Sequence, residues 1–74
     1  MSTDDKLVYM ANQIGRFFAH QPHDQAVAAV ADHIRKYWEP RMRKAILARL
    51  AAGGAGLEPQ VREAVEQLDS PKND

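Results

Sequence analysis

Hydrophobic residues recur at spacings of three and four along most of the chain, which is the pattern of helices that bury one face. No stretch alternates apolar and polar residues with the β-branched enrichment of a strand. The periodic segments are separated by proline or glycine and cover about residues 3–19, 24–38, 40–52 and 59–68. The pattern predicts an all-α fold, a small helical bundle of three main helices plus a short fourth helix. We expect one domain over residues 1–74, with residues 1–5 and 69–74 flexible.

The first segment has an unusually wide apolar face. Ser2 or Thr3 is the predicted cap, and two aspartates follow in the first turn, where carboxylates suit the helix dipole. Its apolar stripe consists of Leu7, Met10, Ala11, Ile14, Phe17 and Phe18. With Val8 and Gly15 included, the apolar arc is about 180° wide, more than one neighbouring helix usually covers. Part of this face is therefore predicted to serve a contact outside the chain.

The second and third segments meet at Pro40. Asp24 is the predicted cap of the second helix, which should reach Trp38 and end before the proline. Its core stripe is Val27, Val30, Ala31, Ile34, Tyr37 and Trp38. Pro40 then opens the third helix, whose apolar side is Met42, Ile46, Leu47 and Leu50. Helical phase places Arg43 inside that apolar side, so its charge must be paired or reach water past its neighbours.

Glycine ends the third helix at residues 53–56, the run GGAG. A phosphate-binding loop would need a preceding strand and a following Lys-Ser/Thr pair, which this run lacks. Pro59 begins the fourth helix, with Val61, Ala64, Val65 and Leu68 as its inward positions.

Small residues also form a row at spacing four in the first segment: Ala11, Gly15 and Ala19. Such a row lets another helix approach closely. The approaching helix is either the chain's own third helix or a separate protein, and the alternative is that Gly15 is a tolerated exposed glycine that costs about 1 kcal/mol relative to alanine.

Composition adds the expectation of a partner. A chain of 74 residues without cysteine has neither disulfide nor thiolate metal site to reinforce a small core. A stability of roughly 4 to 11 kcal/mol is expected from its length.

The acidic start lacks the apolar run of a secretory signal, and no segment has the length to span a bilayer, so we expect a cytoplasmic protein without membrane contact.

Charge is unevenly distributed although the formal net charge is zero. Residues 35–49 contain six basic residues against Glu39, a net charge of +5, whereas residues 1–34 and 50–74 are acidic. This basic patch supports an alternative function, a small helical nucleic-acid-binding regulator. The neutral domain and its acidic flanks argue against that alternative, because binding to DNA scales with the number of phosphates neutralised.

Histidines and the tryptophan are the other candidates for chemistry. A metal site at His20 and His23 is disfavoured because Pro22 separates them and no carboxylate or thiol completes a ligand set. His33 lies apart from both. Spacing places Trp38 on the core stripe, and the alternative is an anchor in a partner's pocket beside the neighbouring arginines.

Three blocks of the sequence resemble the delta subunit of NAD-dependent, molybdenum-containing formate dehydrogenases. They are residues 7–15, LVYMANQIG, followed by Phe17 and Phe18; residues 31–43, ADHIRKYWEPRMR; and residues 53–57, GGAGL, leading to Pro59, Val61 and Arg62. Together they span roughly residues 7 to 66, and their joint order is more specific than any one block.

The resemblance implies a noncatalytic accessory subunit of a cytoplasmic complex that oxidises formate to CO2. In that family, the alpha subunit carries molybdopterin guanine dinucleotide and iron–sulfur clusters, and beta and gamma subunits pass electrons to FMN and NAD. The delta subunit holds no cofactor or metal, attaches to the catalytic alpha subunit, and supports assembly, cofactor loading or stability. With this function we expect no contact with nucleic acid, and the family motif supplies no catalytic residue.

Polar and aromatic residues of the first three predicted helices are the predicted partner contacts. They are Asn12, Gln13, Arg16, Arg35, Trp38, Arg41 and Arg43. Arginine and tryptophan are enriched among the residues that dominate binding at protein interfaces.

Overall fold

The computed structural model describes residues 2–69 and contains four helices in that range. They are α1 (Thr3–Phe18), α2 (His23–Tyr37), α3 (Pro40–Ala51) and α4 (Pro59–Asp69). This arrangement, without a strand in the described range, confirms the predicted all-α bundle and its order. Met1 and residues 70–74, part of the termini expected to be flexible, lie outside the described residues.

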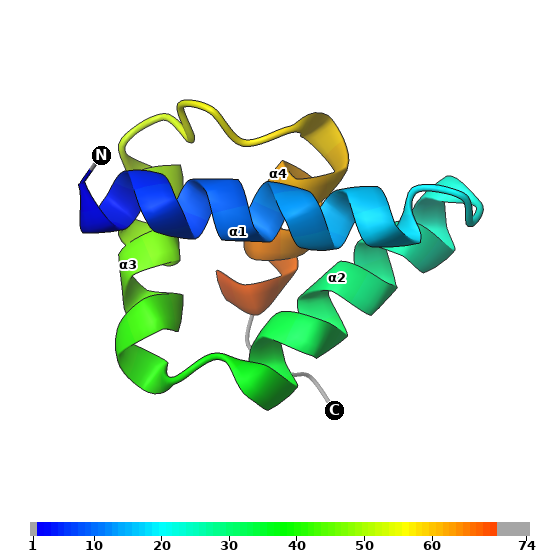
Figure 1. Ribbon diagram of the computed structural model, residues 1–74, viewed down its shortest axis with the longest axis horizontal. Coiled ribbons are helices and arrows are strands. Elements are labelled where there is room, and N and C mark those ends of the chain that lie inside the picture. The colour runs from blue at the N-terminus through cyan, green and yellow to red at the C-terminus, as the bar shows by residue number, and fades with distance from the viewer. Residues whose placement is uncertain (1, 70–74) are drawn as a thin grey trace.

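The helices enclose one core. α1 crosses in front of α4, and α1 and α2 diverge from the turn that joins them, while α3 lies beside the start of α1 (Figure 1). α2 and α3 each pack against both α1 and α4. The core consists of Leu7, Val8, Ala11, Val27, Val30, Ala31, Ile34, Trp38, Ile46, Leu57, Val61, Ala64 and Val65. Trp38 is only 5% exposed, which confirms the core position that spacing favoured for it.

The close helix approach at Gly15 occurs within the chain. Gly15 is buried, and a Cβ atom at this position would collide with a methyl group of Val61 on α4. The helix that approaches Gly15 is therefore the fourth. The prediction that the third helix approaches there is wrong, and so is the alternative of an exposed Gly15. Spacing within α1 carries no information about which helix crosses it.

Most helix ends follow the sequence signals. The Ser2 hydroxyl accepts a hydrogen bond from the backbone N–H of Asp5, and the Ser2 N–H donates to the Asp5 carboxylate, which forms a capping box. Gly53 and Gly54 have φ values of 117° and 69°, the left-handed region that favours glycine. The predicted Asp24 cap is wrong. Pro22 is already extended, with ψ at 148°, so α2 begins one residue before Asp24 and has no side-chain cap.

One ion pair links the start of α1 to α3. Arg49 donates to the Asp5 carboxylate at 2.6 Å, and this bond, with the bonds from Ser2, holds the pKa of Asp5 below its ordinary value. Since the pKa is lowered on folding, this contribution to stability is fully present above the ordinary aspartate pKa of about 3.9. It is lost as the pH falls further, through the folded pKa.

We expect Asp5→Asn to lower the melting temperature at pH 6 by more than at pH 3. Near pH 3, below the ordinary aspartate pKa of about 3.9, the unfolded chain binds a proton at Asp5, so the folded carboxylate loses part of its advantage over the amide. Thermal melts at both pH values measure the difference. Asp4→Asn is the matched control, because Asp4 is also in the first turn of α1 but has no ion pair among the residues described. An equal loss at both pH values would contradict the role of the charge.

Candidate partner-binding groove

α1 carries two apolar faces that point in different directions. One face is buried in the core through Leu7, Val8, Ala11 and Gly15. The other face contains Met10, Ile14 and Phe17, of which Phe17 is 72% exposed. The wide apolar arc is thus divided between the core and the surface, and the contact outside the chain that was expected for its exposed part stays a prediction.

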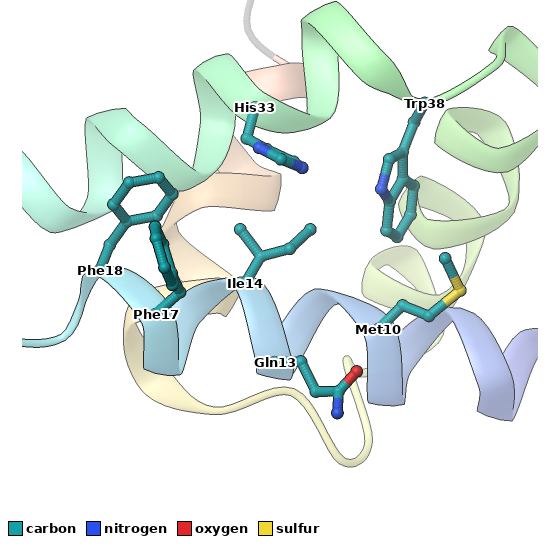
Figure 2. Close-up of a pocket in the computed structure, with 7 residues that line it drawn as sticks. All are labelled: Met10, Gln13, Ile14, Phe17, Phe18, His33 and Trp38. Carbon is teal, nitrogen blue, oxygen red and sulfur yellow. The ribbon is translucent and has the colours of Figure 1, made fainter.

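A groove of about 360 Å3 runs along the second face, between α1 and α2 (Figure 2). Its lining residues are Met10, Gln13, Ile14, Phe17, Phe18, His33 and Trp38. Ile14 projects between the two helices, the two phenylalanines stand at one end, and the Trp38 ring hangs from the end of α2 above Met10 (Figure 2). The phenylalanine rings meet edge to face, with their centroids 5.0 Å apart.

Tyr37 extends the exposed apolar surface next to the groove. It is 71% exposed, so its predicted place on the core stripe of α2 is wrong. It is the last residue of α2, where the helix has diverged from α1, and its ring packs against His33 with centroids 4.8 Å apart. The groove and Tyr37 together offer apolar and aromatic contacts of the kind enriched at binding surfaces.

Two of the predicted contact residues, Gln13 and Trp38, line the groove. Gln13 is exposed, and its amide donates to the hydroxyl of Tyr9 at 3.2 Å. Trp38 faces the core, and the remaining edge of its ring forms the groove wall. Because Trp38 is only 5% exposed, it can offer a partner no more than one edge of its ring, and it is not a free anchor for a partner's pocket.

Asn12 and Arg16 instead hold the loop between α3 and α4 against α1. The Asn12 amide donates to the carbonyl oxygen of Gly56 at 2.9 Å, and its oxygen accepts from the Glu58 backbone at 3.1 Å. Arg16 pairs with the Glu58 carboxylate at 2.7 Å. Both side chains therefore have partners inside the chain.

We expect Asn12→Ala to destabilise the fold by about 1 to 2 kcal/mol, because it removes both hydrogen bonds that fasten the loop. Gln13→Ala should cost about 0.5 kcal/mol or less, since Gln13 is exposed and its side chain makes one hydrogen bond within α1. Chemical denaturation of the two variants measures the difference. Equal stabilities would show that the Asn12 bonds contribute nothing net.

The three remaining predicted contacts lie around the corner between α2 and α3. Arg43 is half-buried and donates to the carbonyl oxygens of Trp38 and, at 3.5 Å, of Arg35. Arg35 donates to the Gln67 carbonyl of α4 at 3.2 Å. Arg41 is exposed and, within residues 2–69, has neither a hydrogen bond nor an ion pair. Arg43 was predicted to be paired or to reach water past its neighbours; its guanidinium is half-buried and donates to carbonyl oxygens, with no ion pair within residues 2–69.

These contacts also occupy most basic side chains of the patch of residues 35–49. Four of its six bases have acceptors within the chain, including Lys36 with Asp32 at 3.5 Å and Arg49 with Asp5 at 2.6 Å. A surface that binds nucleic acid needs bases that are free to reach phosphates. The geometry therefore favours a protein contact over the nucleic-acid alternative.

His23, which was considered as a metal ligand together with His20, contacts side chains of α4. Nε2 of His23 lies 2.8 Å from the Glu63 carboxylate, and its Nδ1 lies 3.4 Å from the Gln60 amide. These contacts join the start of α2 to α4. Among residues 2–69, no group of three or more histidine, cysteine, aspartate or glutamate side chains could hold a metal ion. Within the same range, no helix combines the length and apolarity that crossing a membrane requires.

Sequence reasoning did not select the residues that form most of the groove. The spacing placed Met10, Ile14, Phe17 and Phe18 on the wide apolar arc of α1 without dividing it between core and contact, and His33 was set aside as a flanking histidine. The usable signal was the width of the apolar arc on α1, which exceeded what one neighbour could bury. An apolar residue on that arc was as strong a candidate for contact as an arginine.

Comparison with known proteins gives one match. The family model described as NADH-dependent formate dehydrogenase delta subunit FdsD matches residues 6–65 of the 74. The matched range contains every residue that lines the groove. No curated protein and no solved structure matches the chain.

Proposed function

Since the chain belongs to the family of the NADH-dependent formate dehydrogenase delta subunit, we propose that it is a noncatalytic subunit that binds the catalytic alpha subunit of such an enzyme. The observation that carries this proposal is the family match over residues 6–65. An exposed apolar groove on so small a domain supports it, because the groove has the character of a contact surface.

The cofactors of the complex are assigned to the other subunits. Formate oxidation to CO2 would use molybdopterin guanine dinucleotide and iron–sulfur clusters in the alpha subunit, with FMN and NAD reached through beta and gamma subunits. Iron–sulfur clusters are held by cysteine thiolates, and this chain has no cysteine. Its residues therefore do not fit an iron–sulfur cluster, and no step of the reaction is assigned to this chain.

The mechanism of support is thermodynamic linkage. A chain that binds only the correctly assembled alpha subunit stabilises that state by mass action, by about 2.7 kcal/mol when its free concentration is 100 times its Kd. Assembly, cofactor loading and resistance to unfolding would all benefit from this term. The cytoplasm, where such a soluble enzyme would operate, is the proposed location.

Coexpression with the other subunits tests the proposal. We expect the tagged chain to retain a large molybdenum- and iron-containing protein through washes with 0.5 to 1 M salt, because apolar contacts are not screened as ion pairs are. Metal analysis and formate-dependent NAD reduction of the eluate measure the result. The chain alone should show no formate oxidation.

Recovery of nucleic acid alone, lost on adding salt, would overturn the proposal in favour of the nucleic-acid-binding regulator. Loss of most nucleic-acid binding at 0.2 M salt is the signature of contacts to phosphates. The variants Arg41→Ala and Lys44→Ala remove the two bases of the patch that have no acceptor within residues 2–69, and they would then weaken that binding most.

A further inference from the structure

We infer that the groove between α1 and α2 receives an amphipathic helix of the partner subunit, with acidic residues where that helix passes Trp38. This inference rests on the proposed function and specifies the chemistry of the contact. It is drawn from the shape of the groove, the exposure of its apolar residues and the charges at one of its ends.

The shape fits two turns of a helix. Met10 and Phe17 are seven residues apart on α1, which corresponds to about 10 Å at a rise of 1.5 Å per residue. A bound helix whose apolar residues occupy positions i, i+4 and i+7 spans the same length. Walls from two diverging helices with Ile14 between them form the kind of trough that accepts such a helix (Figure 2).

The apolar surface is too exposed to be explained by the fold alone. Phe17 and Tyr37 are each more than 70% exposed, at opposite ends of the α1–α2 trough region, and Met10 is 40% exposed. A partner with apolar residues at helical spacing would bury all three. Phenylalanine and tyrosine are among the residues enriched in the buried parts of protein interfaces.

Charged residues at the Trp38 end of the groove indicate which polar residues a partner helix should carry. Lys6 lies one turn before Met10 on the same face of α1, and Arg41 follows Trp38 by three residues at the start of α3. Both are exposed, and neither has an ion pair within residues 2–69. Glu39 offsets one of these charges, and Lys44 adds another exposed base one turn into α3. The Trp38 end is therefore basic, and acidic residues complement it.

The absence of cysteine allows a direct test in the assembled complex. Gln13→Cys places one thiol in the chain, at the groove, and Ala48→Cys places one on an exposed position of α3 away from it. Each variant, labelled with a benzophenone maleimide, is assembled with the other subunits and irradiated. Mass spectrometry identifies the peptide joined to each position.

We expect the probe at position 13 to crosslink to a segment of the large subunit with apolar residues spaced by three and four and with aspartate or glutamate at one end. Position 48 should give no crosslink to that segment. Crosslinking of position 13 to a second copy of this chain, to a segment without acidic residues, or to nothing would overturn the inference.

Binding measurements provide the second arm. Phe17→Ser should weaken binding to the alpha subunit by roughly 30-fold, whereas Tyr9→Ser, an exposed aromatic residue of α1 outside the groove lining, should change it less than about threefold. The double variant Lys6→Glu/Arg41→Glu should weaken binding most at low salt. If the wild-type chain binds the alpha subunit and Phe17→Ser binds equally well, the groove inference fails alone. If the wild-type chain does not bind, the proposed function itself fails.

Discussion

Gly15→Val is expected to destabilise the chain by about 3 kcal/mol, the upper part of the range for inserting methyl groups into a packed core. Gly15 faces Val61 across the contact between α1 and α4, and even a Cβ atom would overlap the Val61 side chain. The two helices must separate, which loosens the buried residues on either side. For a domain of this size the loss corresponds to a melting temperature lower by roughly 12 to 24 °C.

A double-mutant cycle with Val61→Ala isolates this contact. Val61→Ala alone should cost about 2 kcal/mol through the cavity it leaves, because Val61 is fully buried. Combined with Gly15→Val, it removes the methyl group nearest position 15, so the double variant should be at least about 1 kcal/mol more stable than the sum of the single effects predicts. Gln13→Val, on the exposed side of α1, is the control for helix propensity and should cost about 0.5 kcal/mol or less. Additive effects would mean that the two residues do not meet.

The helices could be predicted because the signals that define them are local. Spacing of three and four marks the apolar faces, and Pro40 and Gly53 mark boundaries through constraints on their own backbone. Asp24 shows the limit of such signals. Pro22 already supplies an extended residue before α2, and an aspartate two positions later is as suitable inside the first turn as at the cap.

The groove could not be predicted because it depends on the angle between α1 and α2. Spacing shows that Met10, Phe17 and Tyr37 lie on apolar arcs, but only the divergence of the helices decides that they stay outside the core. The contact from Asn12 to Gly56 joins residues 44 positions apart, and no local pattern encodes it. Polar residues selected as contacts were therefore partly occupied in holding the fold.

The predicted contact residues and Phe17 fall into two sets, one that stabilises the fold and one that is exposed at the proposed interface. Asn12, Arg16 and Arg43 bind loop or backbone atoms of the chain itself. Gln13, Phe17 and Arg41 are exposed around the groove, where a change costs little stability. Variants in the first set should act on folding and, through it, on assembly, whereas variants in the second set should act on assembly alone.

Arg43→Ala is expected to destabilise the isolated chain by about 2 kcal/mol, within the range for hydrogen bonds that involve a charged group. Its guanidinium donates to carbonyl oxygens at the end of α2, which have no further helical partner, and so fastens α3 to α2 across Pro40. Arg41→Ala, two positions earlier and exposed, should cost less than about 0.5 kcal/mol. Thermal melts should therefore differ by roughly 8 to 16 °C between wild type and Arg43→Ala and by little for Arg41→Ala.

Arg43→Met tests the hydrogen bonds apart from the apolar part of the side chain, because methionine keeps an unbranched apolar side chain on the helix face of Leu47 and Leu50 but cannot donate. If the hydrogen bonds to α2 carry the effect, Arg43→Met should be nearly as unstable as Arg43→Ala. In the complex, Arg41→Ala should weaken binding to the alpha subunit without changing the melting temperature of the free chain. The opposite result, in which Arg43→Ala melts like wild type but no longer binds, would place its guanidinium at the interface and make Arg43 a contact residue after all.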